Sequence, residues 1–403
     1  MGILRKIIVA LVAATAGIAT TAQAAAETRP RFTRIDTDAG GAPESAGERT
    51  FVELSGNGRY ALFSVRSDSN MVPEPHRTDR PLGTFLVRKD LRTGGTLLVS
   101  VKEDGSPLRA EWRYSAIGWD GTTFAYATGI SGLDPGYEGG VFHRDLDTGV
   151  HRVATMEGRW YFDAIDLSAD GRWLTWSGLE EEGRDNRIYR HDLTSGETTV
   201  PVRCDAAVPF GGCWRSDGPL VSDDGTKLLF RYRAKPGDPL VLTVLDAVTG
   251  TLHSLPESGS YTLSGDGAWI FSVVRTGEYH FELKKVSTAP GATPVVLRTW
   301  AEDTATWAAG VTSADRTGDL VGHYWLSRAQ DTFADSRALV HDRRTGREIT
   351  LPEPRPGTAF IISPTISGDA RVAVVEERCP WVTECGPLGI YAIQLRGLIP
   401  ARD

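Results

Sequence analysis

One turn motif recurs along nearly the whole chain and limits its fold more than any other feature. Its pattern is Ser or Gly, any residue, Asp or Asn, then usually Gly. Seven copies lie at 55–58, 118–121, 168–171, 222–225, 264–267, 313–316 and 367–370, the last two degraded. A second motif, Asp-x-x-Thr/Ser-Gly, follows at 90–94, 145–149, 192–196, 246–250 and 342–346, and is lost in the fifth and seventh copies. The chain is therefore a tandem array of one supersecondary unit.

Each copy alternates β-rich segments with these turns. In the third copy, the segments 164–167, 173–176, 188–191 and 198–200 have the apolar or alternating pattern of strands, which we name a, b, c and d. The Asp of the first motif bonds backbone N–H groups ahead of it and the Gly takes positive φ, which together make a tight a–b hairpin. We therefore interpret four residues as turn residues and not as catalytic carboxylates or calcium ligands: Asp120, Asp170, Asp224 and Asp266.

The repeat length fixes the fold class. Units of roughly 40 to 60 residues with two hairpin turns each are typical of four-stranded propeller blades. The sequence therefore predicts an all-β fold, a seven-bladed β-propeller of four-stranded blades.

The two ends of the chain complete one blade in this prediction. The seventh copy offers only strands a, b and c, at 361–367, 371–375 and 388–395. Near the N-terminus, 33–43 parallels 97–107, which holds the d strand of the first copy. We expect the N-terminal strand to close the last blade and so to remove the open edges of the ring.

The first 26 residues have the character of a secretory signal peptide. Arg5 and Lys6 precede an apolar run, 7–19, which is too short to span a bilayer and is followed by small residues around Ala24. We expect 1–26 to be removed on export and 27–403 to form a single β-propeller domain. No cysteine at the cleavage site could take a lipid, so a soluble secreted, periplasmic or extracellular protein is predicted.

The net charge of the chain limits the classes of partner that it can bind. Without Arg5 and Lys6, the chain carries 42 basic residues (44 less 2) against 52 acidic ones, a formal charge of −10. Such a chain repels nucleic acid and anionic membranes, and no later apolar stretch is long enough for membrane insertion. We expect a monomer whose partner is a protein, a peptide or a glycan.

The four cysteines lie in two close pairs, Cys204 with Cys213 and Cys379 with Cys385. In an exported chain such pairs favour two local disulfides. A zinc site of four thiolates is the alternative, but zinc ligands usually show a Cys-x2-Cys spacing, which neither pair has. We therefore predict two disulfides, no metal ion and no cofactor.

Four stretches near the N-terminus carry a family resemblance. They are 33–35, 54–64, 69–73 and 85–94, the last of which reads Phe-Leu-Val-Arg-Lys-Asp-Leu-Arg-Thr-Gly. Their pattern is similar to the repeat of TolB-type, WD40-like propellers, and the resemblance extends over roughly all of the chain after the signal peptide. It implies the propeller fold and leaves activity open, because that superfamily includes periplasmic binding scaffolds, propeller domains of prolyl-oligopeptidase-like peptidases and some lyases.

The two faces of the predicted propeller are unequal. The a–b and c–d turns on one face are short. The d–a and b–c connections on the other face are long and irregular, at 66–83, 131–140, 178–186, 201–219, 327–336 and 376–387. Variable loops on a rigid scaffold often carry function, although they can equally be tolerated surface insertions. We predict that the rim formed by the d–a and b–c loops is the binding face.

Aromatic and arginine residues gather on this rim, just ahead of strand a in several copies. Aromatic faces and guanidinium groups suit sugars and peptide carboxylates, but large aromatic residues also pack between blades. The candidate ligand-binding residues are Trp112, Arg113, Trp160, Tyr161, Trp214, Arg215 and Trp307.

Catalytic motifs are scarce. The sequence contains no Gly-x-Ser-x-Gly elbow and no His-x-x-x-His pair. We therefore expect an exported, non-catalytic binding or scaffold propeller and name no catalytic residue. The alternative is a carbohydrate-active enzyme, a lyase or hydrolase, that uses the same rim.

Overall fold

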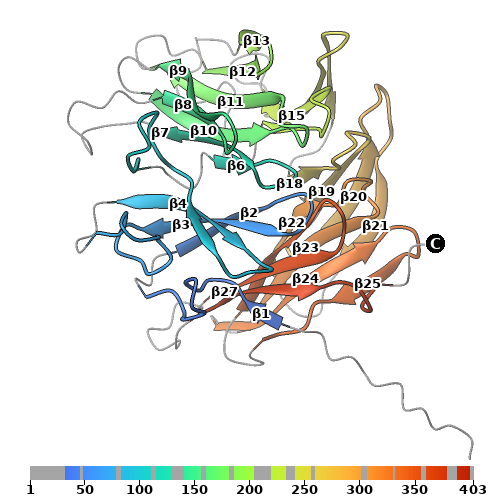
Figure 1. Ribbon diagram of the computed structural model, residues 1–403. Coiled ribbons are helices and arrows are strands. Elements are labelled where there is room, and N and C mark those ends of the chain that lie inside the picture. The colour runs from blue at the N-terminus through green and yellow to red at the C-terminus, as the bar shows by residue number, and fades with distance from the viewer. Residues whose placement is uncertain are drawn as a thin grey trace, which may run out of the picture.

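The computed structural model describes fourteen segments of the chain. They are 32–45, 49–78, 83–109, 115–128, 140–155, 160–180, 186–203, 219–232, 241–255, 259–300, 306–329, 332–354, 360–378 and 388–399. The predicted signal peptide, 1–26, and all four cysteines lie outside these residues. The described residues form seven four-stranded antiparallel sheets and no helix (Figure 1). The prediction of a seven-bladed β-propeller is confirmed.

Each blade runs from strand a to strand d. The a strands are β2 (Arg49–Leu54), β6 (Ser115–Ile117), β10 (Trp160–Leu167), β14 (Leu220–Val221), β18 (Ser260–Leu263), β22 (Thr306–Ala314) and β26 (Phe360–Ile366). The b strands are β3 (Tyr60–Arg66), β7 (Thr123–Thr128), β11 (Trp173–Glu180), β15 (Lys227–Tyr232), β19 (Trp269–Arg275), β23 (Leu320–Ala329) and β27 (Val372–Arg378). The c strands are β4 (Thr84–Asp90), β8 (Gly140–Asp145), β12 (Asn186–Asp192), β16 (Val241–Asp246), β20 (Phe281–Ser287), β24 (Thr332–Asp342) and β28 (Ile390–Gln394). The d strands are β5 (Thr96–Leu98), β9 (Gly149–Thr155), β13 (Glu197–Arg203), β17 (Thr251–Leu255), β21 (Val295–Trp300), β25 (Arg347–Thr350) and β1 (Phe32–Arg34).

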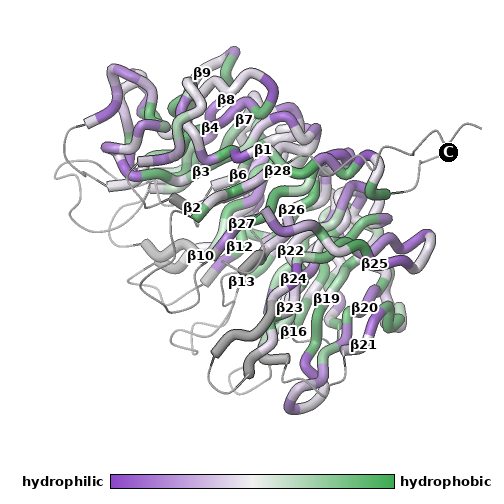
Figure 2. Tube along the Cα trace, turned by 90° about the horizontal axis from the view of Figure 1, so that it is seen from below, coloured by the Kyte–Doolittle hydropathy of each residue, from purple (hydrophilic) through white to green (hydrophobic). Residues whose placement is uncertain are grey.

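The a strands form the inner ring. Each contacts the a strand of the next blade, and β26 contacts β2 to close the ring. The described core consists of seven hydrophobic clusters, one at each junction between adjacent blades. Because a blade buries both of its faces, its middle strands are hydrophobic in near-continuous runs, and β3 is buried from Tyr60 to Val65. In Figure 2 the hydrophobic residues accordingly follow the strands, whereas many of the turns are hydrophilic.

The N-terminal strand completes the last blade, as predicted. Strand β1 pairs antiparallel with β28, with Thr33 opposite Ala392. Just beyond β1, the buried carboxylate of Asp36 accepts hydrogen bonds from the backbone N–H of Ile390 at 3.1 Å and from the Arg34 guanidinium at 2.9 Å. The first β-bridge after β1 also matches its counterpart after β5, since Thr37 pairs with Pro43 as Val101 pairs with Pro107.

The aspartates of the first turn motif are turn residues, as predicted. Their Oδ1 atoms accept the backbone N–H two residues ahead, at 2.9 to 3.0 Å, in Asp120, Asp170, Asp224 and Asp266. The glycine that ends the motif has a φ between 67° and 73° at Gly58, Gly121, Gly171, Gly225 and Gly267. The side chain therefore serves the backbone of its own hairpin.

Two turns differ from the expected alignment. In the sixth blade the turn begins at Asp315 instead of Ser313, because Asp315 accepts the N–H of Leu320 and Gly318 takes a φ of 67°. In the fifth blade the c–d turn is retained and not lost. Ser287 replaces the aspartate and accepts the N–H of Ala289, and Gly291 has a φ of 75°.

Candidate functional site

A cavity of about 340 Å³ occupies the end of the central channel nearest the a–b turns. Residues from all seven blades line it, near the ends of their a strands. Three of the lining residues carry carboxylates, Glu53, Asp166 and Asp223, and one, Arg316, is cationic. Charged groups at a converging concave site make this cavity the candidate functional site.

A ring of hydrogen bonds between neighbouring a–b turns holds this end of the channel. The N–H of Asn57 donates to the carbonyl of Trp119 at 3.0 Å, and the N–H of Arg316 donates to the carbonyl of Gly368 at 3.0 Å. Similar backbone bonds join six of the seven junctions in the described turns. The side chains that follow the first residue of each turn are thereby fixed around the channel axis.

The residue at this second turn position alternates between small and large around the ring. In blade order it is Gly56, Trp119, Ala169, Asp223, Gly265, Arg316 and Gly368, and all seven line the cavity. Large side chains come from the second, fourth and sixth blades. Small residues in the other four leave room for them near the axis.

Trp119, Asp223 and Arg316 meet at the end of the channel. A Cβ on Gly56 would lie 2.1 Å from the Trp119 indole, so only glycine allows this approach. The Arg316 guanidinium lies 5.3 Å from the centroid of that ring, and its Nε is 3.0 Å from Oδ2 of Asp223. Arg316 is thus held by a cation–π contact and an ion pair that connect three blades.

Glu53 and Asp166 lie deeper in the channel wall and link neighbouring blades. Oε2 of Glu53 accepts the backbone N–H of Ile117 at 2.9 Å, and Oδ2 of Asp166 accepts the N–H of Val221 at 2.7 Å. Ser313 makes the corresponding link in the sixth blade, where its Oγ accepts the N–H of Ile366. A hydroxyl therefore suffices for this structural role, and two carboxylates exceed what the link requires.

All three carboxyl groups have raised pKa values. Burial raises the pKa of Glu53 well above its ordinary value and the Asp166 charge raises it further, against the opposing effect of the Ile117 N–H. Burial likewise raises the pKa of Asp166, assisted by the charge of Asp223. Burial raises the pKa of Asp223 to about 6, although Arg316 opposes the rise. The cavity therefore keeps protons at pH values where ordinary carboxylates have lost them.

This arrangement suits a proton or an organic cation better than an anion. Arg316 is paired with Asp223, so Glu53 and Asp166 face the cavity with no cationic side chain paired to them among its described lining residues. Among the described residues, no group of three or more His, Cys, Asp or Glu side chains could hold a metal ion.

The predicted rim residues lie elsewhere. Trp160 and Tyr161 begin strand β10 and Trp307 is the second residue of β22, so their backbones lie at the end of strand a opposite the a–b turns. Trp112, Arg113, Trp214 and Arg215 lie outside the described residues, as do the cysteines of the two predicted disulfides. The rim site and the disulfides therefore stay predictions.

Sequence reasoning did not single out the channel residues. Glu53 and Asp166 stand two residues before the first turn residue, where the other blades have Ala116, Leu220, Thr262, Ser313 and Thr365. Glu53 and Asp166 could have been identified from the sequence, because they are the acidic residues at a position of strand a that is neutral in the other blades. The alternation at the second turn position was the signal for Trp119, Asp223 and Arg316.

Comparison with known proteins supports the fold. No protein-family model and no curated protein matches the chain. A crystal structure of oligogalacturonate lyase from Vibrio parahaemolyticus is 12% identical with a TM-score of 0.59, and the match covers 92% of this chain and 95% of that one. Prolyl oligopeptidase B from Galerina marginata is 13% identical with a TM-score of 0.56, over 86% of this chain and 49% of that one. At these identities the likeness shows the propeller fold alone.

TolB structures match more weakly. TolB from Acinetobacter baumannii is 16% identical with a TM-score of 0.41, over 79% of this chain and 82% of that one. A likeness at that level carries no argument about function or export. Membership of the TolB-type repeat family therefore stays a prediction.

Proposed function

We propose that this protein is a non-catalytic binding propeller that holds the ammonium group of a small ligand in the a–b end of its central channel. One observation carries the proposal: Glu53 and Asp166 face one cavity, and the charge of Asp166 raises the pKa of Glu53. Two carboxylates that repel each other in a poorly hydrated site gain free energy when a cation enters between them.

The size and lining of the cavity fit a ligand of about one sugar ring or one amino acid. Its volume of about 340 Å³ is at the lower end of the range for small-molecule pockets. The indole of Trp119 adds an aromatic surface next to the carboxylates. An amino sugar or an amino-acid amine would place its ammonium on Glu53 and Asp166 and its body toward Trp119.

Binding of a cation should release protons, because the bound charge lowers the raised pKa values of the two carboxyl groups. Calorimetric titration with glucosamine in two buffers of different ionisation enthalpy measures this release. Glucose is the matched neutral probe, since it has a hydroxyl where glucosamine has the ammonium. We expect saturable binding of glucosamine, release of up to one proton, and no binding of glucose at the same concentrations.

Charge-removing variants locate the site. Glu53→Gln and Asp166→Asn keep an acceptor for the N–H groups of Ile117 and Val221 but lose the charge, so each should weaken glucosamine binding by about tenfold. Glu197→Gln removes a carboxylate from the exposed start of strand β13 and should leave affinity unchanged. Equal affinities in all three variants would show that the ammonium binds somewhere else.

The rim of d–a and b–c loops stays a separate proposal for a larger protein, peptide or glycan partner. It rests on loop length and on the aromatic and arginine residues of the sequence. Alanine replacements at Trp112, Trp160 and Trp214 test it, since release of a partner captured by the exported protein would identify that rim. Export itself is tested by sequencing the N-terminus of the secreted chain.

A hydrolytic or eliminative enzyme is the second candidate. The observation that favours it is the pair of carboxyl groups with raised pKa values, because one protonated and one ionised carboxyl group can act as acid and base on a glycosidic bond. Turnover of a polysaccharide by the purified protein, abolished by Glu53→Gln, would support this candidate over a binding role. Proton release on glucosamine binding without turnover would support the binding role.

A further inference from the structure

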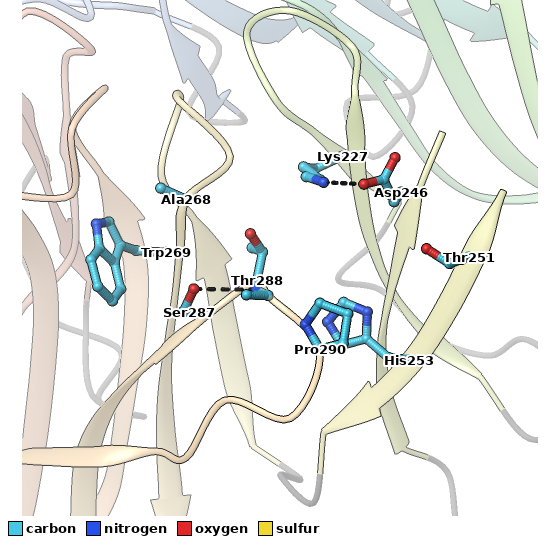
Figure 3. Close-up of a pocket in the computed structure, with 10 residues that line it drawn as sticks. Lys227, Asp246, Thr251, His253, Ala268, Trp269, Ser287, Thr288 and Pro290 are labelled. Atoms are coloured by element: carbon cyan, nitrogen blue, oxygen red, sulfur yellow. Dashed lines mark hydrogen bonds and ion pairs between the residues drawn. The ribbon is translucent and has the colours of Figure 1, made fainter. Parts of the chain in front are cut away.

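A second cavity lies between the fourth and fifth blades, at their c–d turns (Figure 3). Its volume is about 360 Å³. The fourth blade contributes Lys227, Asp246, Thr251 and His253, and the fifth contributes Trp269 and the turn 287–290. It shares no lining residue with the channel cavity.

The cavity exists because two large side chains are missing at this junction. Between the first two blades, Arg88 covers the ring of Tyr60, at 4.3 Å from its centroid, and donates to the carbonyl of Gly121. Between the third and fourth blades, Arg190 covers Trp173 at 3.3 Å and donates to the carbonyl of Gly225.

The fourth blade has Val244 in place of the arginine and Lys227 in place of the aromatic residue. The lysine amine bends to Asp246 instead of crossing to the next blade. Strand d and the turn of the fifth blade therefore border open space.

Among the polar groups that line this cavity, those not already used in hydrogen bonds within the protein are mostly donors. Asp246 is fully occupied, because Oδ1 accepts the N–H groups of Val248 and Thr249 and Oδ2 accepts Lys227 Nζ at 2.5 Å. Lys227 keeps two further N–H groups after that bond. Ser287 Oγ accepts the N–H of Ala289 and so retains its own proton for a ligand.

His253 is the most telling group. Both ring nitrogens are buried, and neither makes a hydrogen bond of good geometry among the described residues, although the Thr288 backbone acts on the ring. Buried ring nitrogens without well-formed hydrogen bonds are costly, and a ligand that supplies an acceptor removes that cost. Figure 3 shows the His253 ring and the Trp269 ring on opposite sides of the cavity.

The surroundings add positive potential. Lys285 Nζ lies 4.2 Å from the centroid of the Trp269 ring, and the Arg343 guanidinium of the sixth blade lies 5.5 Å from it. Lys227 and Asp246 neutralise each other. A ligand in this cavity therefore meets several donors and no carboxylate oxygen that lacks a partner, while Lys285 and Arg343 lie outside the lining, against the Trp269 ring.

We propose that this cavity binds a small organic molecule of about sugar-ring size that carries one oxyanion, with the oxyanion held by Lys227 and His253 and the body beside Pro290 and Ser287. A carboxylate and a phosphate share this chemistry. The volume exceeds what a bare inorganic anion needs, so an uncharged body is part of the ligand.

Binding should strengthen as pH falls. Burial lowers the pKa of His253 in the free protein, Lys227 lowers it further, and the Thr288 backbone and Asp246 oppose the fall. These are the groups that face the imidazole from both blades. A bound oxyanion favours the imidazolium and so raises the pKa of His253. The affinity for the oxyanion therefore increases as the pH falls from the His253 pKa of the complex to that of the free protein.

Ligand-observed NMR with glucuronate, glucose 6-phosphate and glucose tests the proposal on the whole mature protein. Glucuronate is the carboxylate source and keeps its charge above about pH 5, so its affinity at about pH 5.5 and pH 8 reports the histidine. Glucose 6-phosphate is the phosphate source, and glucose is the neutral control. We expect saturable binding of at least one anionic probe, no binding of glucose, and tighter glucuronate binding at the lower pH if the carboxylate is accepted.

The matched variants are His253→Gln, Lys227→Met and His151→Gln. Methionine keeps the stem of Lys227 under Gly267, and His151 is an exposed histidine on a d strand away from the cavity. His253→Gln should weaken anion binding by about tenfold and remove the protein's part of the pH dependence, and Lys227→Met should weaken it similarly, whereas His151→Gln should change nothing. Absence of saturation with either anion up to about 10 mM, or affinities unaffected by His253→Gln and Lys227→Met, would overturn the proposal.

Discussion

Gly225 lies directly against the indole ring of Trp173, so close that a Cβ on Gly225 would stand 2.0 Å from Cδ1 of the ring. The two residues belong to neighbouring blades, and Arg190 locks them by covering the indole and donating to the Gly225 carbonyl at 3.0 Å. Gly121 and Tyr60 repeat the contact at the first junction, where the corresponding distance is 2.2 Å. The turn glycine thus serves both its own hairpin and the docking of blades.

Replacing Gly225 by alanine should therefore cost more than a turn glycine usually does. Gly225 and Gly250 have φ values of 70° and 71°, but a Cβ on Gly250 would meet nothing within 4 Å. Gly250→Ala should lower the free energy of unfolding by about 1 kcal/mol, and Gly225→Ala by about 3 kcal/mol or more, because the clash adds to the backbone strain. Urea unfolding of both variants measures the difference. Equal losses would mean that the blade contact adapts to the extra carbon.

Removing the buried Asp36 carboxylate should destabilise the closure of the last blade. Asp36→Ala removes the acceptor of the Ile390 N–H and leaves the Arg34 guanidinium without its carboxylate, although it keeps the Leu388 carbonyl, and should cost about 3 kcal/mol. Asp104→Ala is the control, because Asp104 accepts hydrogen bonds from Ser106 at an exposed turn. Its loss should stay below about 1 kcal/mol. Thermal unfolding followed by circular dichroism compares the two, and similar losses would contradict the role of Asp36.

Neutralising Glu53 should change how stability depends on pH. A carboxyl group with a raised pKa holds its proton in the folded state when the unfolded chain has lost it, so stability falls as pH rises from about 4 through the folded pKa. Glu53→Gln removes this decline while it keeps an acceptor for Ile117. The variant should unfold at a higher temperature than the parent at about pH 8 and near the same temperature at about pH 4. A larger gain at the acidic end would show that the sign is wrong.

Removing the positive charge of Arg316 should improve binding of an ammonium ligand in the channel. Arg316→Met takes a guanidinium from the end of the cavity and leaves the Asp223 carboxylate unpaired, so glucosamine affinity should rise several-fold at low salt. Arg371→Met is the control on the same face, since its side chain is 79% exposed and it does not line the cavity. Weaker binding in Arg316→Met would mean that the guanidinium itself contacts the ligand.

The repeat in the sequence is enough to predict most of the fold. Turn residues such as Asp170 and Gly171 have local chemical reasons, so their spacing identifies hairpins, and seven hairpin pairs imply seven blades. The sequence pattern does not predict that the sixth turn begins at Asp315. There an aspartate replaces the first serine of the turn and accepts the N–H group five residues ahead. The c–d turn at Ser287 is not predicted either, because there a serine replaces the aspartate of the motif.

The channel site could not be assembled from the sequence in the same way. Trp119, Asp223 and Arg316 are about 100 residues apart along the chain, and only closure of the ring brings their side chains together at the axis. Burial is the main cause of the raised pKa of Asp223, and burial at the axis depends on all seven blades at once. The cavity beside His253 could not be predicted from the sequence either, because it arises where Val244 and Lys227 replace an arginine and an aromatic residue that fill the space at other junctions.

Strand β1 is synthesised first but pairs with the last strand of the chain, and the bond from Ile390 to Asp36 spans 354 residues. Sealing the ring is therefore the contact with the greatest entropy of loop closure, and we expect it to come late in folding. Until it forms, β28 of the last blade and β1 itself each expose an unpaired edge on which a second nascent chain could dock. A circular permutant with β1 placed after β28 would build every blade from neighbouring residues, because it would replace the long-range pairing of β1 with β28 by a local one.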